Sequence, residues 1–176
     1  MNKMAIVLQM SKKLVARPEI PPQARVTVRN YRGPQDISRW LEIRRQAFAT
    51  ETPAARPWTK DDFTAEVRDK PWWSPQRLWL AENLEHGGPV GAVILGLRTG
   101  GAQRRAVVHW LAVVPAWRHQ GIGRLLMAHL EEDCWQLGYR EIYLETHANW
   151  QAAVRLYRQL GFTSNKTIAQ KITSRL

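Results

Sequence analysis

One segment constrains this chain most, because it joins a strand, a tight loop and a helix without interruption. Residues 106–114 are an apolar run that ends at Pro115, and a short basic turn follows. Gly121 and Gly123 then open a stretch whose apolar residues recur at helical spacing. The N–H groups at a helix start lack partners within the helix and lie at the positive end of its dipole, so they attract phosphate oxygens. Since glycine lets a ligand approach the backbone closely, this segment predicts a binding loop for a phosphate-bearing ligand.

Two common phosphate motifs do not fit this loop. A P-loop ends in Gly-Lys followed by Ser or Thr, and that tripeptide is missing here. The dinucleotide fingerprint needs a small residue three positions after its second glycine, where this chain has Leu126. An ordinary strand–turn–helix with glycine in the turn is the remaining alternative at this point.

The rest of the chain shows a mixture of strand and helix patterns, which predicts an α+β (mixed α/β) fold with a central sheet. We expect strands at residues 24–29, 77–82, 90–98, 106–114, 142–146 and 167–173, and helices at residues 35–48, 60–70, 121–137 and 152–160. Proline-rich residues 18–22 precede the first of these strands. We therefore expect residues 1–23 to be a basic N-terminal extension and residues 24–176 to form a single domain.

Two motifs carry a family resemblance. Residues 118–123 have the pattern Arg-x-x-Gly-x-Gly and follow Leu-x-Val-x-Pro at residues 111–115, while residues 156–162 have the pattern Leu-Tyr-x-x-x-Gly-Phe. In this order they resemble the GNAT (GCN5-related N-acetyltransferase) superfamily over residues 24–173. The resemblance implies a mostly antiparallel mixed sheet, splayed between its fourth and fifth strands and flanked by about four helices. It also implies acetyl-CoA as cosubstrate, no metal, and transfer of the acetyl group to a primary amine by direct attack on the thioester.

The resemblance also assigns a CoA site. The backbone of Leu111 and Val113 would hold the pantetheine arm and the acetyl carbonyl. The pyrophosphate would bind backbone amides of the loop, which belong to His119, Gln120, Gly121, Ile122, Gly123 and Arg124. Family members usually carry Asn seven residues before the motif's Tyr, where this chain has Trp150. We expect Asn149, one residue earlier, to reach the pantetheine if the helix entry is shifted by one position.

Two residues are candidates for proton transfer. Tyr157 matches the family's general acid for the leaving thiolate. Glu145 precedes it by twelve residues and resembles the general base of the ribosomal-protein alanine N-terminal acetyltransferases. His109 and His147 are alternative bases because histidine titrates near neutral pH, and a chain of water molecules is another alternative. A strand-end carboxylate in a salt bridge is the structural alternative for Glu145.

Charge and composition limit the partners. The formal net charge is +11, which we attribute to a solvated basic surface and attraction for CoA phosphates, and nucleic acid is a less favoured partner. No apolar run reaches the ~18 residues of a membrane span, and a single cysteine excludes an internal disulfide. We therefore expect a cytoplasmic monomer or homodimer that takes a small-molecule or peptide amine. The alternative function is a non-catalytic acyl-CoA-binding or basic nucleic-acid-interacting module.

Overall fold

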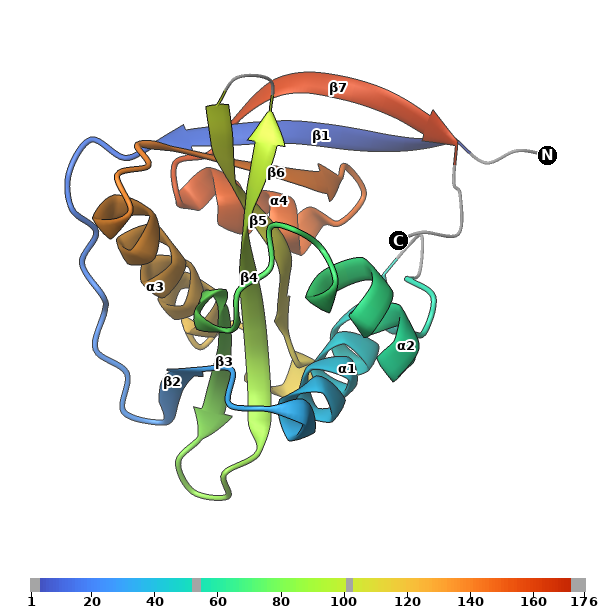
Figure 1. Ribbon diagram of the computed structural model, residues 1–176, viewed down its shortest axis with the longest axis vertical. Helices are drawn as coiled ribbons and strands as arrows, with labels where there is room; N and C mark the ends of the chain where they lie inside the picture. The colour runs from blue at the N-terminus through green and yellow to red at the C-terminus, as the bar shows by residue number, and fades with distance from the viewer. Residues whose placement is uncertain (1–3, 52–54, 101–102, 172–176) are drawn as a thin grey trace.

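The described part of the chain forms a seven-stranded sheet. Helices cover both faces of this sheet (Figure 1). The computed structural model describes residues 4–51, 55–100 and 103–171. The strands are β1 (Met4–Lys13), β2 (Val26–Asn30), β3 (Leu78–Asn83), β4 (Pro89–Gly100), β5 (Gln103–Val113), β6 (Glu141–His147) and β7 (Thr163–Lys171). The α-helices are α1 (Pro34–Phe48), α2 (Lys60–Phe63), α3 (Ile122–Gln136) and α4 (Gln151–Gln159). Short 3₁₀ turns span Pro75–Arg77 and Pro115–Trp117, and a π-helical turn, Thr64–Arg68, continues α2.

The sheet order is β2-β3-β4-β5-β6-β1-β7. Neighbouring strands are antiparallel except β5 and β6, which are parallel. The expected mixed and mostly antiparallel sheet is confirmed. A capping box begins α2, since the Thr59 side chain accepts from the Asp62 N–H and the Asp62 carboxylate accepts from the Thr59 N–H.

The N-terminus requires a correction. Residues 4–13, expected to belong to an extension, form β1 in the sheet between β6 and β7. Its register places Gln9 opposite both Glu145 of β6 and Lys166 of β7. Without β1, the facing edges of β6 and β7 would present unpaired backbone groups, so the pairing satisfies three strands at once. No local sequence pattern signals this pairing, because its partners are more than a hundred residues away.

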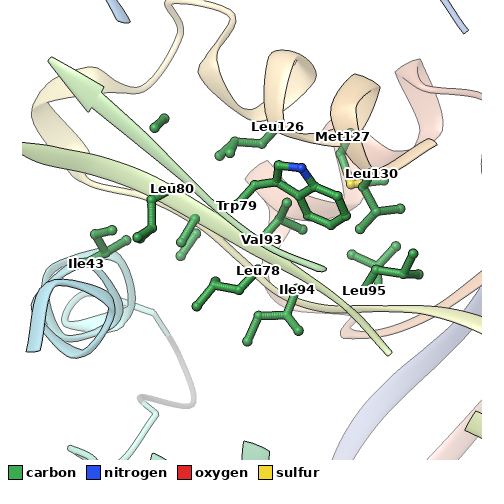
Figure 2. Packing of buried hydrophobic residues seen from close by; sticks show 14 of the residues in the cluster. Ile43, Leu78, Trp79, Leu80, Val93, Ile94, Leu95, Leu126, Met127 and Leu130 are labelled. Atoms are coloured by element: carbon green, nitrogen blue, oxygen red, sulfur yellow. The ribbon is translucent and has the colours of Figure 1, made fainter. Parts of the chain in front are cut away.

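The core consists of two apolar layers, one on each face of the sheet (Figure 2). Alternate residues of β3 and β4 point to opposite faces, as the pleat of a strand requires. Trp79, Val93 and Leu95 lie on the face covered by α3, which contributes Leu126, Met127 and Leu130. Leu78, Leu80 and Ile94 lie on the other face, where α1 contributes Ile43. The sheet is therefore fixed from both sides, which holds the strand ends that carry the candidate site.

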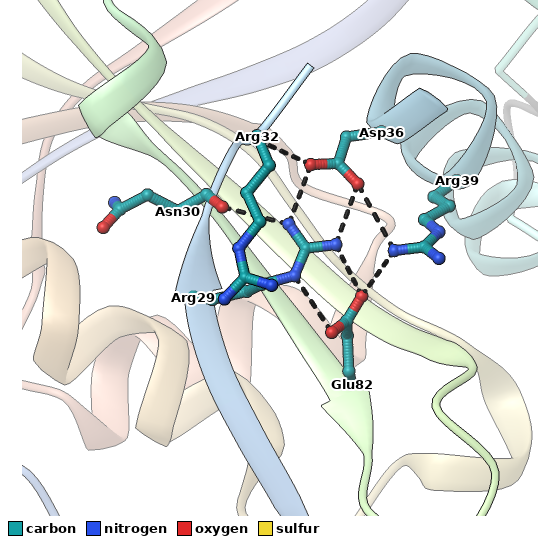
Figure 3. Close-up of polar contacts among 6 residues, drawn as sticks. All are labelled: Arg29, Asn30, Arg32, Asp36, Arg39 and Glu82. Atoms are coloured by element: carbon teal, nitrogen blue, oxygen red, sulfur yellow. Dashed lines mark hydrogen bonds and ion pairs between the residues drawn. The ribbon is translucent and has the colours of Figure 1, made fainter. Parts of the chain in front are cut away.

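A buried charge cluster joins the start of α1 to β2 and β3 (Figure 3). Arg29 donates hydrogen bonds to Asp36 at 2.7 and 2.8 Å and to Glu82 at 2.6 and 2.9 Å. Arg39 donates to Glu82 at 2.8 Å, and the Arg32 N–H donates to Asp36 at 2.8 Å. Burial acts to raise the pKa of Asp36, but the hydrogen bonds from Arg29 and Arg32 outweigh it, so this pKa lies below its usual value.

Candidate active site

The parallel strands β5 and β6 separate soon after they meet. They pair only at Ala106 with Ile142 and at Val107 with Tyr143. Just beyond, β5 carries two residues, Trp110 and Leu111, opposite one residue of β4, which is a β-bulge. Trp110 has a φ of 54°, an uncommon conformation for a bulky residue. The bulge bends β5 where the strands part, and the expected splay between these two strands is present.

The splay exposes backbone groups of β5. Val114 donates its N–H to the carbonyl of Val90 on β4, at 2.9 Å. Because alternate residues of a strand direct their N–H and C=O groups to opposite sides, Leu111 and Val113 direct theirs toward the gap. The Val113 carbonyl accepts a hydrogen bond from Nε of Arg118 at 3.2 Å, so Arg118 ties the loop to the strand. The N–H groups on this side of β5 are the donors that the gap offers.

The glycine loop leads into α3, whose N-cap is Gly121 with a φ of 79° and no side-chain cap. A Cβ on Gly121 would meet no atom within 4 Å, so the approach to this backbone is open. Gly123 differs, because a Cβ there would lie 3.0 Å from Cδ2 of Leu156 on α4. The two glycines therefore have different structural roles. Gly121 allows a left-handed turn and leaves the approach to the backbone open, and Gly123 allows α3 and α4 to pack closely.

A cavity of about 580 Å³ lies over this loop. Of the expected CoA-binding residues, it is lined by Leu111, Val113, His119, Gly121, Ile122, Gly123 and Arg124. Arg155 of α4 adds a further cation, which the sequence motifs do not indicate. Gln120 does not line the cavity, and its side chain instead donates to Ala116 and accepts from Arg25. Asn149 is exposed and lines neither this cavity nor the next, whereas its neighbour Trp150 lines both.

A second cavity, of about 760 Å³, is lined by the segments of β5 and β6 that separate at the splay. Its wall is rich in aromatic residues, which include Trp58, Trp72, Trp110 and Trp150. The two cavities share five lining residues, which are Phe48, Leu111, Trp150, Ala153 and Tyr157. A ligand in the first cavity and a ligand in the second would therefore meet beside Tyr157 and the exposed backbone of β5.

Tyr157 and Glu145 both line the second cavity. The Tyr157 ring is buried and packs edge-on against Phe162, with 5.8 Å between ring centroids. Burial raises the pKa of Tyr157, so its hydroxyl keeps its proton at neutral pH. Glu145 is exposed on β6 and accepts a hydrogen bond of 2.7 Å from Nε2 of Gln9. No salt bridge of Glu145 occurs among the described residues, so the structural alternative for it is not supported.

The two histidines are poor candidates for a base. His109 stacks on Trp72 with 4.7 Å between ring centroids. Burial, and then the charge of Arg98, lower the pKa of His109 to about 3. Burial also lowers the pKa of His147. Both imidazoles are neutral at pH 7, and a group with a pKa near 3 accepts a proton from an ammonium ion much less readily than an ordinary histidine.

Two other features, a metal-binding group and a membrane-spanning helix, are absent from the described part of the chain. There, no group of three or more His, Cys, Asp or Glu side chains is arranged to hold a metal ion. No helix in residues 4–51, 55–100 or 103–171 combines the length and apolarity needed to span a membrane.

Comparison with known proteins adds independent evidence. A family model described as the acetyltransferase (GNAT) family matches residues 39–162. A mycothiol acetyltransferase from Mycobacteroides abscessus is 34% identical over 158 residues, which cover 88% of this chain and 51% of that relative. Our chain thus spans about half the length of the curated relatives that it matches.

Solved structures share the fold. A GCN5-related N-acetyltransferase from Sphaerobacter thermophilus aligns with a TM-score of 0.77 at 22% identity, over 94% of this chain and 50% of that one. A GNAT family acetyltransferase from Brucella melitensis in complex with acetyl-CoA aligns with a TM-score of 0.62 at 19% identity, over 84% and 88%. The family match extends from α1 through α4 and includes the splayed strands and the glycine loop. The chain belongs to the GNAT family of acetyltransferases.

Proposed function

We propose that this protein transfers the acetyl group of acetyl-CoA to a primary amine, by direct attack of the amine on the thioester. The observation that carries the proposal is the meeting of the two cavities at Tyr157, across the gap between β5 and β6. One cavity adjoins a glycine loop suited to phosphate, and the other is large enough for an acceptor. The names of the relatives agree with an acetyltransferase.

The first cavity, which lies over the glycine loop and which we call the loop-side cavity, suits CoA. The N–H groups at the start of α3 have no side-chain cap, and Gly121 leaves open space above them. We assign the CoA phosphates to the backbone amides from His119 to Arg124, with Arg124 and Arg155 adding positive charge. The pantetheine arm would run along β5, where N–H groups of Leu111 and Val113 face the gap. Asn149 is the weakest of the expected contacts, because its exposed side chain lines neither cavity.

The residues that transfer protons line the second cavity, which we call the acceptor-side cavity. Glu145 accepts a proton from the ammonium form of the acceptor, which frees the nitrogen lone pair for attack on the thioester carbon. The oxyanion that forms is stabilised by an N–H on the gap side of β5. When the C–S bond breaks, Tyr157 donates its proton to the departing thiolate, and the nitrogen of the new amide releases its second proton to water or back to Tyr157. The low pKa of His109 favours Glu145, directly or through water, over this histidine as the base.

The decisive experiment replaces Tyr157 with Phe, which keeps the buried ring and removes only the hydroxyl. Loss of a general acid typically reduces the rate by ~10²–10⁴-fold, so we expect a drop of that order in kcat with acetyl-CoA affinity preserved. Tyr139→Phe is a matched control, because Tyr139 lines neither cavity. A Tyr157→Phe enzyme with normal kcat, measured where chemistry limits the rate, would exclude Tyr157 as the acid.

The acceptor screen for this assay covers small amines and short peptides. A non-catalytic acyl-CoA-binding module would bind acetyl-CoA and acetylate none of them. A nucleic-acid-binding module would instead show affinity for nucleic acid that falls steeply with salt.

A further inference from the structure

The acceptor-side cavity contains a pair of arginines, here called the basic pair, that has no role in the proposed acetyl transfer. Arg98 of β4 and Arg105 of β5 are direct cross-strand partners and line this cavity. Like charges opposite each other on adjacent strands destabilise a sheet. Among the described residues, neither arginine has a carboxylate within ion-pair distance. The pair is therefore a local excess of positive charge with no carboxylate in direct contact, and Glu145 acts on Arg98 only at longer range.

Aromatic rings hold both guanidinium groups in place. Arg98 lies over the Trp72 ring at 5.7 Å from its centroid, and Arg105 lies over Tyr143 at 5.0 Å. Trp72 and Tyr143 line the same cavity. Stacking on a ring leaves the N–H groups at the edge of a guanidinium free to donate, and Arg binds carboxylate and phosphate through such paired donors.

The register of the strands relates this pair to the catalytic residues. Arg105 and Val107 share a face of β5, and Val107 pairs with Tyr143 of β6. Glu145 lies two residues beyond Tyr143 on the same face, which is about 7 Å along a strand. Gln9 and Lys166 are in register with Glu145 on β1 and β7, and Lys166 also lines the cavity. The basic pair thus lies at the closed end of the splay, with Glu145 on the side toward the open end.

We infer that Arg98 and Arg105 form an anion subsite, and that the acceptor carries both a primary amine and an oxyanion, a carboxylate or a phosphate. Their separation would be about the 7 Å between Glu145 and Tyr143, because the Arg105 guanidinium lies over the Tyr143 ring. This inference rests on the proposed function, because it takes the amine to lie at Glu145. The C-terminal carboxylate of a dipeptide and the phosphate of an aminoalkyl ester both match this spacing, whereas the carboxylate of a free α-amino acid lies too close to its amine.

The test compares acceptors that differ only in charge. The carboxylate arm uses glycylglycine and glycylglycinamide, and the phosphate arm uses 3-aminopropyl phosphate and 3-aminopropanol. We expect kcat/KM to be about tenfold higher for the anionic member of at least one pair. This ratio corresponds to the lower end of the free-energy range for a hydrogen bond to a charged group, because both arginines are partly solvent-exposed. The arm with the larger ratio identifies the anion.

Two glutamine variants and a control make the test specific. In Arg98→Gln and Arg105→Gln the ratio of kcat/KM between the anionic and the neutral member of each pair should fall toward unity, because the anionic acceptor loses a guanidinium partner. Arg104→Gln removes an exposed charge from the neighbouring position, which does not line the cavity, and should preserve the preference. Equal rates for charged and neutral acceptors, or a preference that survives both glutamine variants, would overturn the inference.

A binding measurement separates failure of this inference from failure of the proposed function. The same four acceptors are titrated into protein saturated with CoA, so that the loop-side site is already filled. Arginine-dependent binding of the anions, with no turnover of these four compounds or of any amine in the acceptor screen, would reject the proposed function and retain the subsite. Turnover of amines with no charge preference would reject the subsite and retain the function. Equal binding of all four without turnover would reject both.

Discussion

Arg29 is the residue whose removal should most weaken the attachment of α1 to the sheet. Its side chain is only 9% exposed and bridges Asp36, 4% exposed, and Glu82, 14% exposed. Replacing Arg29 with Met keeps an apolar side chain of similar length and leaves two carboxylates facing each other. Removing one partner of a buried ion pair typically costs about 3–5 kcal/mol. Arg39 stays 2.8 Å from Glu82 but is 41% exposed, so it compensates only in part.

We therefore expect Arg29→Met to lower the free energy of unfolding by about 3 kcal/mol at pH 7, the lower end of that range. For a chain of this size such a loss corresponds to a fall in Tm of roughly 6–12 °C. The measurement is urea denaturation with an unchanged m-value, which reports stability alone. Arg45→Met is the matched control, because Arg45 pairs with Glu42 on the surface of α1, with exposures of 62% and 45%. It should cost at most about 0.5 kcal/mol.

The dependence on pH provides a second check. The folded-state pKa of Asp36 lies below its unfolded value, so this carboxylate stabilises the fold above the unfolded pKa. That contribution is lost as the pH falls through the folded pKa. Without Arg29, burial instead favours the protonated acid, and the variant should lose less stability on acidification. The difference between wild type and Arg29→Met should therefore narrow below about pH 4. A difference in the free energy of unfolding that stays the same when the pH is lowered from 7 to about 3, or that is no larger than that of Arg45→Met, would refute this reasoning.

Three other predictions concern the site. Glu145→Gln should lower kcat by ~10²–10⁴-fold while acetyl-CoA affinity is preserved, and a normal rate would transfer the role of base to water or a histidine. Gly121→Val should weaken acetyl-CoA binding in calorimetry because its side chain would occupy the open approach, and it should also lower Tm because valine disfavours a φ of 79°. Gly123→Val should lower Tm by pressing on Leu156, and adding Leu156→Ala should recover part of that Tm. His109→Gln should leave the pH–rate profile unchanged between about pH 5 and 8, because the pKa of His109 is about 3. Because that pKa is lowered, wild type should lose stability as the pH falls below about 6.5 and the variant should lose less, which acid titration of Tm can measure.

The sequence by itself determined the features that depend on neighbouring residues. The strand, turn and helix around Gly121 follow from a run of apolar residues, a proline and two glycines, and the structure has them where the pattern predicts. The capping box at Thr59 is likewise contained within four residues. The family motifs predicted more of the fold than local patterns did, because they indicate both the splayed strands and the helix that contains Tyr157.

Only the tertiary structure decided which distant segments pair. The placement of β1 depends on backbone groups of β6 and β7 that are far away in the sequence. The bulge at Trp110 becomes visible only when β5 is aligned with β4, and the tight fit of Gly123 only when α4 packs on α3. The meeting of Arg98 with Arg105 likewise depends on cross-strand register. Local propensity acts over a few residues, whereas register and packing are selected by burial and backbone pairing over the whole chain.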